Sequence, residues 1–218
     1  MGEFFHSFTP GQTGWLFMWA ILVLFVFSVA IIIERIYYIS IRSNVNAPRF
    51  MTEIRKLVLN SDYKRAIALC KSAGHRALPE VVKKALEEAE KMEFIDFRTI
   101  QNTVDEAALE IIPRLSARTG YLAMIANVST LIGLLGTIFG LIIAFASFSV
   151  AGGGSVAGDL ARGISIAMYT TFAGLAVAIP AFIFHHIITS ATTSIIDDID
   201  EHSVKLIHLL TGSAASGN

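Results

Sequence analysis

Charged residues are scarce in this chain. Only 16% of its 218 residues are Asp, Glu, Lys or Arg, whereas 54% are hydrophobic, and the mean hydropathy is +0.61. The runs Trp15–Ile33 and Asn127–Val150, of 19 and 24 residues, contain no charged residue at all. This composition is typical of integral membrane proteins. At about 1.5 Å per residue, a helix made from either run is about 30 Å long, which is the thickness of the hydrocarbon layer.

Residues that carry familiar enzyme chemistry are also missing. The one cysteine, Cys70, cannot form a disulfide within the chain. The sequence has no zinc-spaced set of Cys and His, no nucleophile elbow and no glycine-rich nucleotide loop. We therefore expect no enzyme activity, no cofactor, no metal site and no nucleic-acid partner.

Basic residues are absent from residues 1–14 and gather in one segment. Fifteen of the 17 Lys and Arg residues lie between Arg35 and Arg118; the others are Arg162 and Lys205. Without a basic start, the first apolar run does not match a cleavable signal peptide, so we expect it to be retained. Loops rich in Lys and Arg face the cytoplasm. The basic segment is therefore predicted to be cytoplasmic, with the N-terminus and the Ala151–Asp159 loop outside.

These patterns predict an all-α polytopic membrane protein with three transmembrane helices. Two long segments outside the spans, one of them at the C-terminus, are expected to be helical and cytoplasmic. The predicted layout is an external N-terminus 1–14, transmembrane helix 15–39, cytoplasmic helical region 40–122, transmembrane helix 123–150, external loop 151–160, transmembrane helix 161–188, and C-terminal helix and tail 189–218.

Apolar residues in the cytoplasmic region recur at helical spacing. The last such run leads from Ile100 toward the second span, and we expect Pro113 to bend that helix. The acidic residues Glu87, Glu88, Glu90 and Glu93 match the solvated face of a helix rather than a catalytic cluster. The expected apolar faces are Phe50, Ile54, Leu57 and Val58; Ala66, Ile67, Leu69 and Cys70; Val82, Ala85, Leu86 and Ala89; and Ile100, Val104, Ala107, Ala108, Ile111, Ile112 and Leu115.

Small residues form a stripe along each of the last two spans. Gly133, Gly136 and Gly140 lie at i, i+3 and i+7, so they share a face on which another helix can approach closely. The stripe continues through small or polar residues, and a second stripe runs along the third span. Its further members are Asn127, Thr130, Thr137, Ala144 and Ser147 in the second span, and Thr171, Gly174, Ala178, Ala181 and His185 in the third. Whether these stripes pack within one chain or against other chains is left open by the sequence.

Two hydroxyl residues, Thr137 and Thr171, have two readings. Each side chain can bond a backbone carbonyl one turn earlier in its own helix, or it can line an ion path. Ionisable side chains are absent from the apolar cores of all three spans. If these helices surround an ion path, the group that titrates must therefore come from another chain.

The segments IANVSTLIGLLGTIFGLIIAF (Ile125–Phe145) and GISIAMYTTFAGLAVAIPAFIFH (Gly163–His185) resemble the MotA/TolQ/ExbB proton-channel family. Three spans with one large cytoplasmic insertion are similar to its ExbB and TolQ branch. The resemblance is close over about 65 residues, in a pair of motifs on consecutive spans.

The resemblance implies a homopentamer in the bacterial inner membrane, with its N-terminus periplasmic and its C-terminus cytoplasmic. Spans two and three would line a central pore that holds two copies of a single-span partner of the ExbD or TolR type. That partner would supply the titrating aspartate, and a TonB-like protein and membrane lipids are further expected partners. Thr137 and Thr171 correspond to the family's pore threonines. The expected ion-pathway residues are Thr137, Thr171, Thr170, Ser147 and Thr130, and the expected helix-packing residues are Gly133, Gly136, Gly140 and Gly174.

One position departs from the family pattern. ExbB and TolQ sequences carry a glutamate near the start of the third span, where this chain has Ile166, and Thr170 adds a hydroxyl beside Thr171. The transported ion is therefore expected to be H⁺, with Na⁺ as the alternative, since neutral oxygens also suit a hard cation. The work performed is expected to be TonB-dependent import, with motility or envelope maintenance as alternatives. A non-conducting scaffold is the remaining reading.

Overall fold

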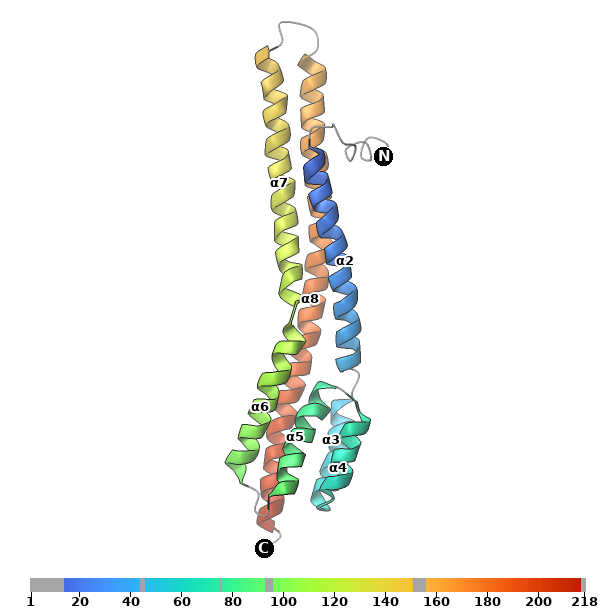
Figure 1. Cartoon of the computed structure of the whole chain (residues 1–218), viewed down its shortest axis with the longest axis vertical. Coiled ribbons are helices and arrows are strands. Elements are labelled where there is room, and N and C mark those ends of the chain that lie inside the picture. The colour runs from blue at the N-terminus through green and yellow to red at the C-terminus, as the bar shows by residue number, and fades with distance from the viewer. Residues whose placement is uncertain (1–13, 44–45, 75, 93–95, 151–155, 217–218) are drawn as a thin grey trace. The chain divides into compact units, whose positions relative to one another are not determined.

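A computed structural model describes residues 14–43, 46–74, 76–92, 96–150 and 156–216 (Figure 1). Within these ranges every regular element is an α-helix. The chain divides into two compact units. The first unit contains the chain up to Glu34 together with Arg118–Ile187, and the second contains Arg35–Ala117 and the chain from Ile188 onward.

The first unit is built from α2 (Trp15–Ser43), α7 (Thr119–Val150) and α8 (Val156–Ser216), of which α2 and α8 continue into the second unit. Three helical stretches in the described chain are long and apolar enough to cross a membrane. A helix suits this setting because it satisfies its backbone hydrogen bonds within one segment. The predicted class, an all-α protein with three membrane spans, is confirmed.

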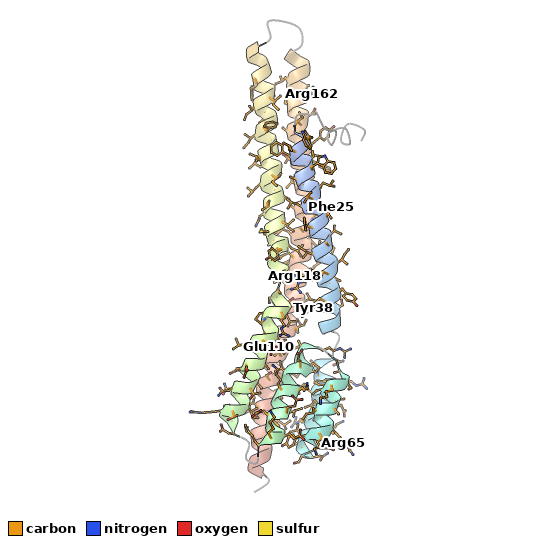
Figure 2. The ribbon with its side chains drawn as sticks, viewed as in Figure 1. Phe25, Tyr38, Arg65, Glu110, Arg118 and Arg162 are labelled. Atoms are coloured by element: carbon orange, nitrogen blue, oxygen red, sulfur yellow. The ribbon has the colours of Figure 1, made fainter. Side chains whose placement is uncertain are left out.

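Side chains of α2 pack on α8 in the first unit. Met18 and Ile21 form a buried cluster with Ala173 and Val177, and Ile132 of α7 adds to it. Other large side chains of α2 remain exposed, such as Phe25, which is labelled in Figure 2. Exposed apolar side chains are expected on a helix whose remaining faces meet lipid or other chains.

The helix that leads toward the second span does not run on without a break. α6 (Phe97–Ser116) continues through Pro113 and ends three residues later, and Arg118 has a positive φ of 63° before α7 begins. The side chain of Arg118 forms an ion pair with Glu34 of α2 within the first unit. The chain is therefore interrupted at residues 117–118, because a residue with positive φ cannot continue a right-handed helix. The expected bend at Pro113, which lies inside α6, stays a prediction.

The second unit contains a row of four helices and the C-terminal part of α8. α3 (Ala47–Leu59) packs on α4 (Tyr63–Ser72), α4 packs on α5 (Ala77–Lys91), and α5 packs on α6. The apolar faces expected from helical spacing form the core of this unit. Its buried members include Ile54, Val58, Ala66, Ile67, Cys70, Val82, Ala85, Leu86, Ala89, Ile100, Val104, Ala107, Ile111 and Leu115.

Polar side chains fix the ends of these helices. Asn46, Asp62 and Asp96 each accept a hydrogen bond from a backbone N–H three residues later, at the starts of α3, α4 and α6. The hydroxyl of Thr99 also donates to Asp96, over 3.0 Å. These hydrogen bonds from Thr99 lower the pKa of Asp96, because they stabilise its ionised carboxylate.

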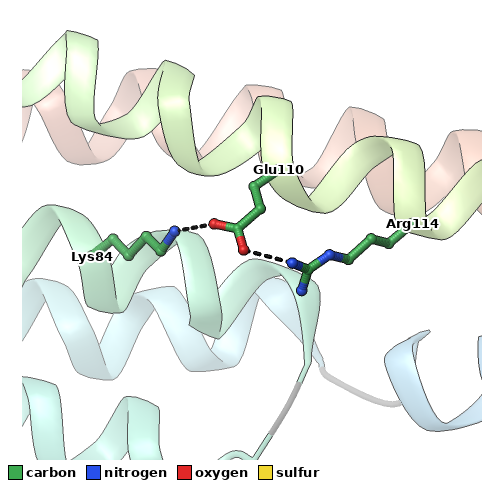
Figure 3. Close-up of polar contacts among 3 residues, drawn as sticks. All are labelled: Lys84, Glu110 and Arg114. Carbon is green, nitrogen blue, oxygen red and sulfur yellow. Dashed lines mark hydrogen bonds and ion pairs between the residues drawn. The ribbon is translucent and has the colours of Figure 1, made fainter.

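Exposed ion pairs lie on the surface of these helices, and one of them joins α5 to α6. Glu110 of α6 accepts hydrogen bonds from Lys84 of α5, over 2.5 Å, and from Arg114, over 2.6 Å (Figure 3). Glu87 and Glu88 pair with lysines of their own helix, as expected of a solvated face, whereas Glu93 lies outside the described residues. Such exposed pairs contribute little stability, so the apolar core holds the unit together.

Cys70 is buried within the second unit. Burial raises the pKa of its thiol to about 12, so the thiol stays protonated near neutral pH. Because the thiolate is the nucleophile in alkylation, a protonated and enclosed thiol is inert.

We therefore expect Cys70 to react with a maleimide at neutral pH only after unfolding. The matched control is Cys70→Ala/Ser72→Cys, which moves the thiol two residues along α4 to an exposed position. This control should be labelled in the folded protein. Mass spectrometry measures both rates, and equally fast labelling of native Cys70 would show that the α4–α5 packing is wrong.

Candidate ion pathway

The backbones of α7 and α8 approach each other closely along the glycine stripe of α7. A β-carbon added to Gly140 would lie 2.7 Å from the carbonyl oxygen of Gly163 and 2.8 Å from the backbone nitrogen of Ala167. A β-carbon at Gly136 would lie 2.6 Å from the β-carbon of Thr170. No real β-carbon fits at such distances, so these positions require glycine.

The contact is built from small residues on both helices. At Gly163 an added β-carbon would lie 2.8 Å from the Cα of Ala144, and at Gly174 it would lie 2.6 Å from the carbonyl oxygen of Ser129. At Gly133 it would lie 3.1 Å from the carbonyl oxygen of Thr170. The stripes that the sequence left unassigned therefore pack against each other within one chain. This close approach is the usual way in which helices associate in a membrane, where van der Waals contact replaces the hydrophobic effect.

The helix α2 marks one side of this contact. On α7, Ile132 packs against the cluster that α2 forms, and Phe139 lies 5.3 Å from Phe17 between ring centroids. On α8, the residues in that cluster are Ala173 and Val177. The other side of the α7–α8 contact therefore faces away from α2.

Three of the expected pathway residues lie on that other side. With 3.6 residues per turn, Thr130 and Thr137 lie about 40–60° to one side of Gly133, and Ile132 lies about 100° to the other. Thr171 lies about 60° to one side of Gly174, and Val177 about 60° to the other. Since Ile132 and Val177 face α2, we name Thr130, Thr137 and Thr171 the threonine edge.

Each hydroxyl of the threonine edge donates a hydrogen bond to a backbone carbonyl of its own helix. Thr137 Oγ1 donates to the carbonyl of Leu134 over 2.5 Å, Thr171 Oγ1 to that of Ala167 over 3.2 Å, and Thr130 Oγ1 to that of Ala126 over 3.1 Å. A hydroxyl oxygen that has donated still has lone pairs to offer. The two readings of these threonines are thus compatible: they bond their own backbone and present neutral oxygens to a cation or a donor.

Thr170 takes a different position from its neighbour Thr171. Its side chain is 1% exposed and faces Gly136, and its hydroxyl donates to backbone carbonyls of Ile166 and Ala167 at 3.0 Å. It therefore fills the α7–α8 contact instead of lying on the threonine edge, and its expected pathway role stays a prediction. The side chain of Ser147 lies outside the described residues, so its expected role is likewise a prediction.

Position 166 lies on the α2 side of α8. The Cγ2 atom of Ile166 is 2.9 Å from where a β-carbon at Gly14 would lie, and Gly14 has a φ of +105°. Thr171 is about 140° away around the helix. Ile166 therefore packs against the residue that precedes α2, and within one chain it does not face the threonine edge.

The threonine edge is set among exposed apolar side chains. Leu134, Leu141, Met168 and Leu175 are all exposed around it. Residues 119–150 and 163–184 contain no Asp, Glu, Lys, Arg or His. Within the described ranges, no group of three or more His, Cys, Asp or Glu could hold a metal ion. The edge can therefore solvate a charge but cannot itself carry a proton by titration.

Of the residues in this contact, Gly133, Gly136 and Gly140 of α7 and Gly174 of α8 were predicted from the sequence, whereas Gly163 and Ala167 were missed. These two residues precede Thr170 and Gly174 at steps of four, three and four. This spacing places all four residues on one helix face. The same periodicity that identified the stripe of α7 would have found them.

Comparison with known proteins gives a family match over most of both units. A model of the MotA/TolQ/ExbB proton channel family matches residues 73–201. The Biopolymer transport protein exbB1 of Vibrio cholerae is 47% identical over 60 residues, which are 28% of this chain and 26% of that protein.

Two longer matches cover most of the chain. The ExbB-like protein 3 of Synechocystis sp. is 33% identical over 169 residues, which are 75% of each chain. The ExbB homolog of Methanothermobacter thermautotrophicus is 25% identical over 168 residues, which are 77% of this chain and 57% of that protein. The matched part thus spans about a quarter of the Vibrio protein, three quarters of the Synechocystis protein and just over half of the archaeal one.

The close approach of α7 and α8 predicts that a larger residue at Gly140 destabilises the protein. Gly140→Ala should lower the free energy of unfolding by about 1–3 kcal/mol, because its β-carbon meets backbone atoms that cannot move aside. Gly120→Ala is the matched control, since nothing lies within 4 Å of a β-carbon there. Denaturant unfolding in detergent measures both. Equal stabilities for the two variants would contradict the close approach of α7 and α8.

Proposed function

Because this chain belongs to the MotA/TolQ/ExbB proton channel family, on its ExbB/TolQ-like side, we propose that it is a subunit of an inner-membrane motor driven by an ion gradient. The proposed subunit conducts ions together with a partner and passes the energy to another process. In the proposed orientation the N-terminus is periplasmic and the C-terminus cytoplasmic, in keeping with the basic residues between Arg35 and Arg118.

The observation that carries this proposal is the threonine edge. Packing of α7 on α8 requires only small residues, and glycine and alanine supply them. The hydroxyls of Thr130, Thr137 and Thr171 are not needed for that contact, yet they lie together on the side that α2 leaves open. Oxygens arranged in this way on an apolar surface favour an ion path over a purely structural face.

The proposed assembly is a homopentamer whose threonine edges face a central pore. Two helices of an ExbD/TolR-like partner occupy this pore, and an aspartate of the partner takes up and releases the proton. The chain's own contribution is a wall of neutral oxygens, which lowers the cost of moving a charge past apolar helices. Each elementary charge that crosses supplies about 2.3 kcal/mol per 100 mV of membrane potential.

TonB-dependent import is the first choice for the process that this energy drives, with motility and envelope maintenance as alternatives. H⁺ is the first choice for the ion, because the partner's carboxylate would titrate. Na⁺ is the alternative, since hydroxyl and carbonyl oxygens also coordinate a hard monovalent cation. Ile166 packs against Gly14 and does not face the threonine edge. We therefore propose that the choice of ion depends on the hydroxyls at positions 130, 137 and 171.

The proposal predicts that Thr137→Val and Thr171→Val each abolish ion flux that depends on the partner. Valine keeps the shape of threonine but removes the oxygen that would solvate the ion. The measurement uses liposomes that contain the chain and its partner, with an H⁺ gradient and a Na⁺ gradient applied in turn. The gradient that drives flux in the unmodified protein identifies the ion.

Ser165→Ala is the control for this experiment. Ser165 is exposed and two residues from both Gly163 and Ala167, so it points away from α7 and its hydroxyl should be dispensable. Native mass spectrometry checks that each variant still forms the oligomer. Full flux in the Thr137→Val/Thr171→Val double variant would refute the pathway, and no flux in the unmodified protein would favour a non-conducting scaffold.

A further inference from the structure

A groove of about 670 Å³ lies between α3 and the C-terminal part of α8, within the second unit. Its apolar lining includes Met51 of α3 and Leu206 and Leu209 of α8. Arg55 and Lys205 line it as well. The groove therefore combines an apolar surface with basic side chains from two helices.

Of these two basic residues, Lys205 is paired with a carboxylate, whereas Arg55 is not paired with any residue that the structure describes. Lys205 forms an ion pair with Glu201, four residues earlier in α8. Within the described part of the chain, no ion pair includes Arg55, which is exposed. The groove thus carries an excess of positive charge beside its apolar lining, and it suits an acidic surface that also offers an apolar side chain.

The outer face of α6 has the complementary character. Leu109 is 75% exposed, more than any other large hydrophobic residue among those described. It lies two residues from both Ala107 and Ile111, which are buried, so it points away from the core of its unit. Asp105 and Glu106 lie one turn before Leu109, are exposed, and make no ion pair with any residue that the structure describes.

The two surfaces lie on different parts of the same unit. The main helix contacts of this unit are α3 on α4, α4 on α5 and α5 on α6, so the groove beside α3 and the exposed face of α6 belong to different helices. A contact that joins one surface to a different surface of the next copy is head-to-tail, and it forms a ring when the rotation between copies closes. Because the exposed face of α6 complements the groove in charge and apolar character, the occupant that these observations favour is a second copy of this chain.

We propose that the acidic face of α6, centred on Leu109 and flanked by Asp105 and Glu106, docks into the groove between α3 and α8 of the neighbouring copy. This interface rests on the proposed ring, and it assigns which surfaces of the second unit hold neighbours together. The leucine side chain contacts Met51, Leu206 and Leu209, and Glu106 pairs with Arg55. Opposite charges across such a contact select the register of the two copies.

Disulfide crosslinking in the full-length chain tests this interface. The variant Met51→Cys/Leu109→Cys is made in a Cys70→Ala background, and mild oxidation should link neighbouring copies into a ladder of covalent multimers. The control Leu59→Cys/Leu109→Cys places the first thiol on an exposed part of α3 that does not line the groove. Neither this control nor the single-cysteine variants should give the ladder.

Charge reversal tests the basic and acidic partners in the same assay. Arg55→Glu and Glu106→Arg should each lower the yield of crosslinked multimers roughly tenfold, as for a tenfold weaker association. The two substitutions together should restore the yield, because the pair is re-formed with its signs exchanged. A merely structural role for either side chain does not predict this rescue.

The oligomeric state of each variant is measured separately by native mass spectrometry. A stable oligomer that gives no ladder, or charge reversals without rescue, would overturn the interface while the proposed motor subunit stands. A chain that stays monomeric with and without its partner would instead refute the proposed function. A phospholipid that copurifies and shields the introduced cysteine at position 51 would assign the groove to lipid and also overturn the interface.

Discussion

The close approach of α7 to α8 is the constraint on which the first unit depends. At Gly136, Gly140 and Gly163, atoms of the facing helix lie only 2.6–2.7 Å from where a β-carbon would be. In a membrane, the hydrophobic effect does not press helices together, so contact at this distance supplies the attraction. The same contact fixes the rotation of both helices, and rotation decides which side chains face outward.

That rotation separates two adjacent threonines. Thr170 is turned into the contact, where it fills the space opposite Gly136, while Thr171 is turned to the edge that α2 leaves open. With Thr130 and Thr137 it gives an apolar surface a line of neutral oxygens. The tight packing of the two helices thus determines where the proposed ion path lies. A partner is proposed to supply the titrating group.

Much of this arrangement could be predicted from the sequence. Long apolar runs indicated three spans, and helical spacing identified the buried faces of the second unit, such as Ile54, Val58, Val82 and Leu86. These features depend only on local periodicity. The family resemblance added the expectation of a proton channel, which the family match supports.

Other features require the packing of segments that are distant in the sequence. Thr170 and Thr171 lie four and three residues before Gly174, so both are near its helix face, and only the contact with Gly136 shows which of them is buried. The position of Ile166 against Gly14, and the interruption of the chain at Arg118, likewise depend on contacts or backbone angles that periodicity does not reveal. The groove between α3 and α8 joins residues about 150 positions apart, so no motif could have revealed it.

Thiol accessibility tests the orientation of α8 most directly. Thr171→Cys and Thr170→Cys are compared in a Cys70→Ala background, in the assembled oligomer without its partner, by the rate of labelling with a small, membrane-impermeant reagent. The account predicts that the cysteine at position 171 is labelled, that adding the partner protects it, and that the cysteine at position 170 stays unlabelled. Faster labelling at position 170 than at position 171 would contradict the account.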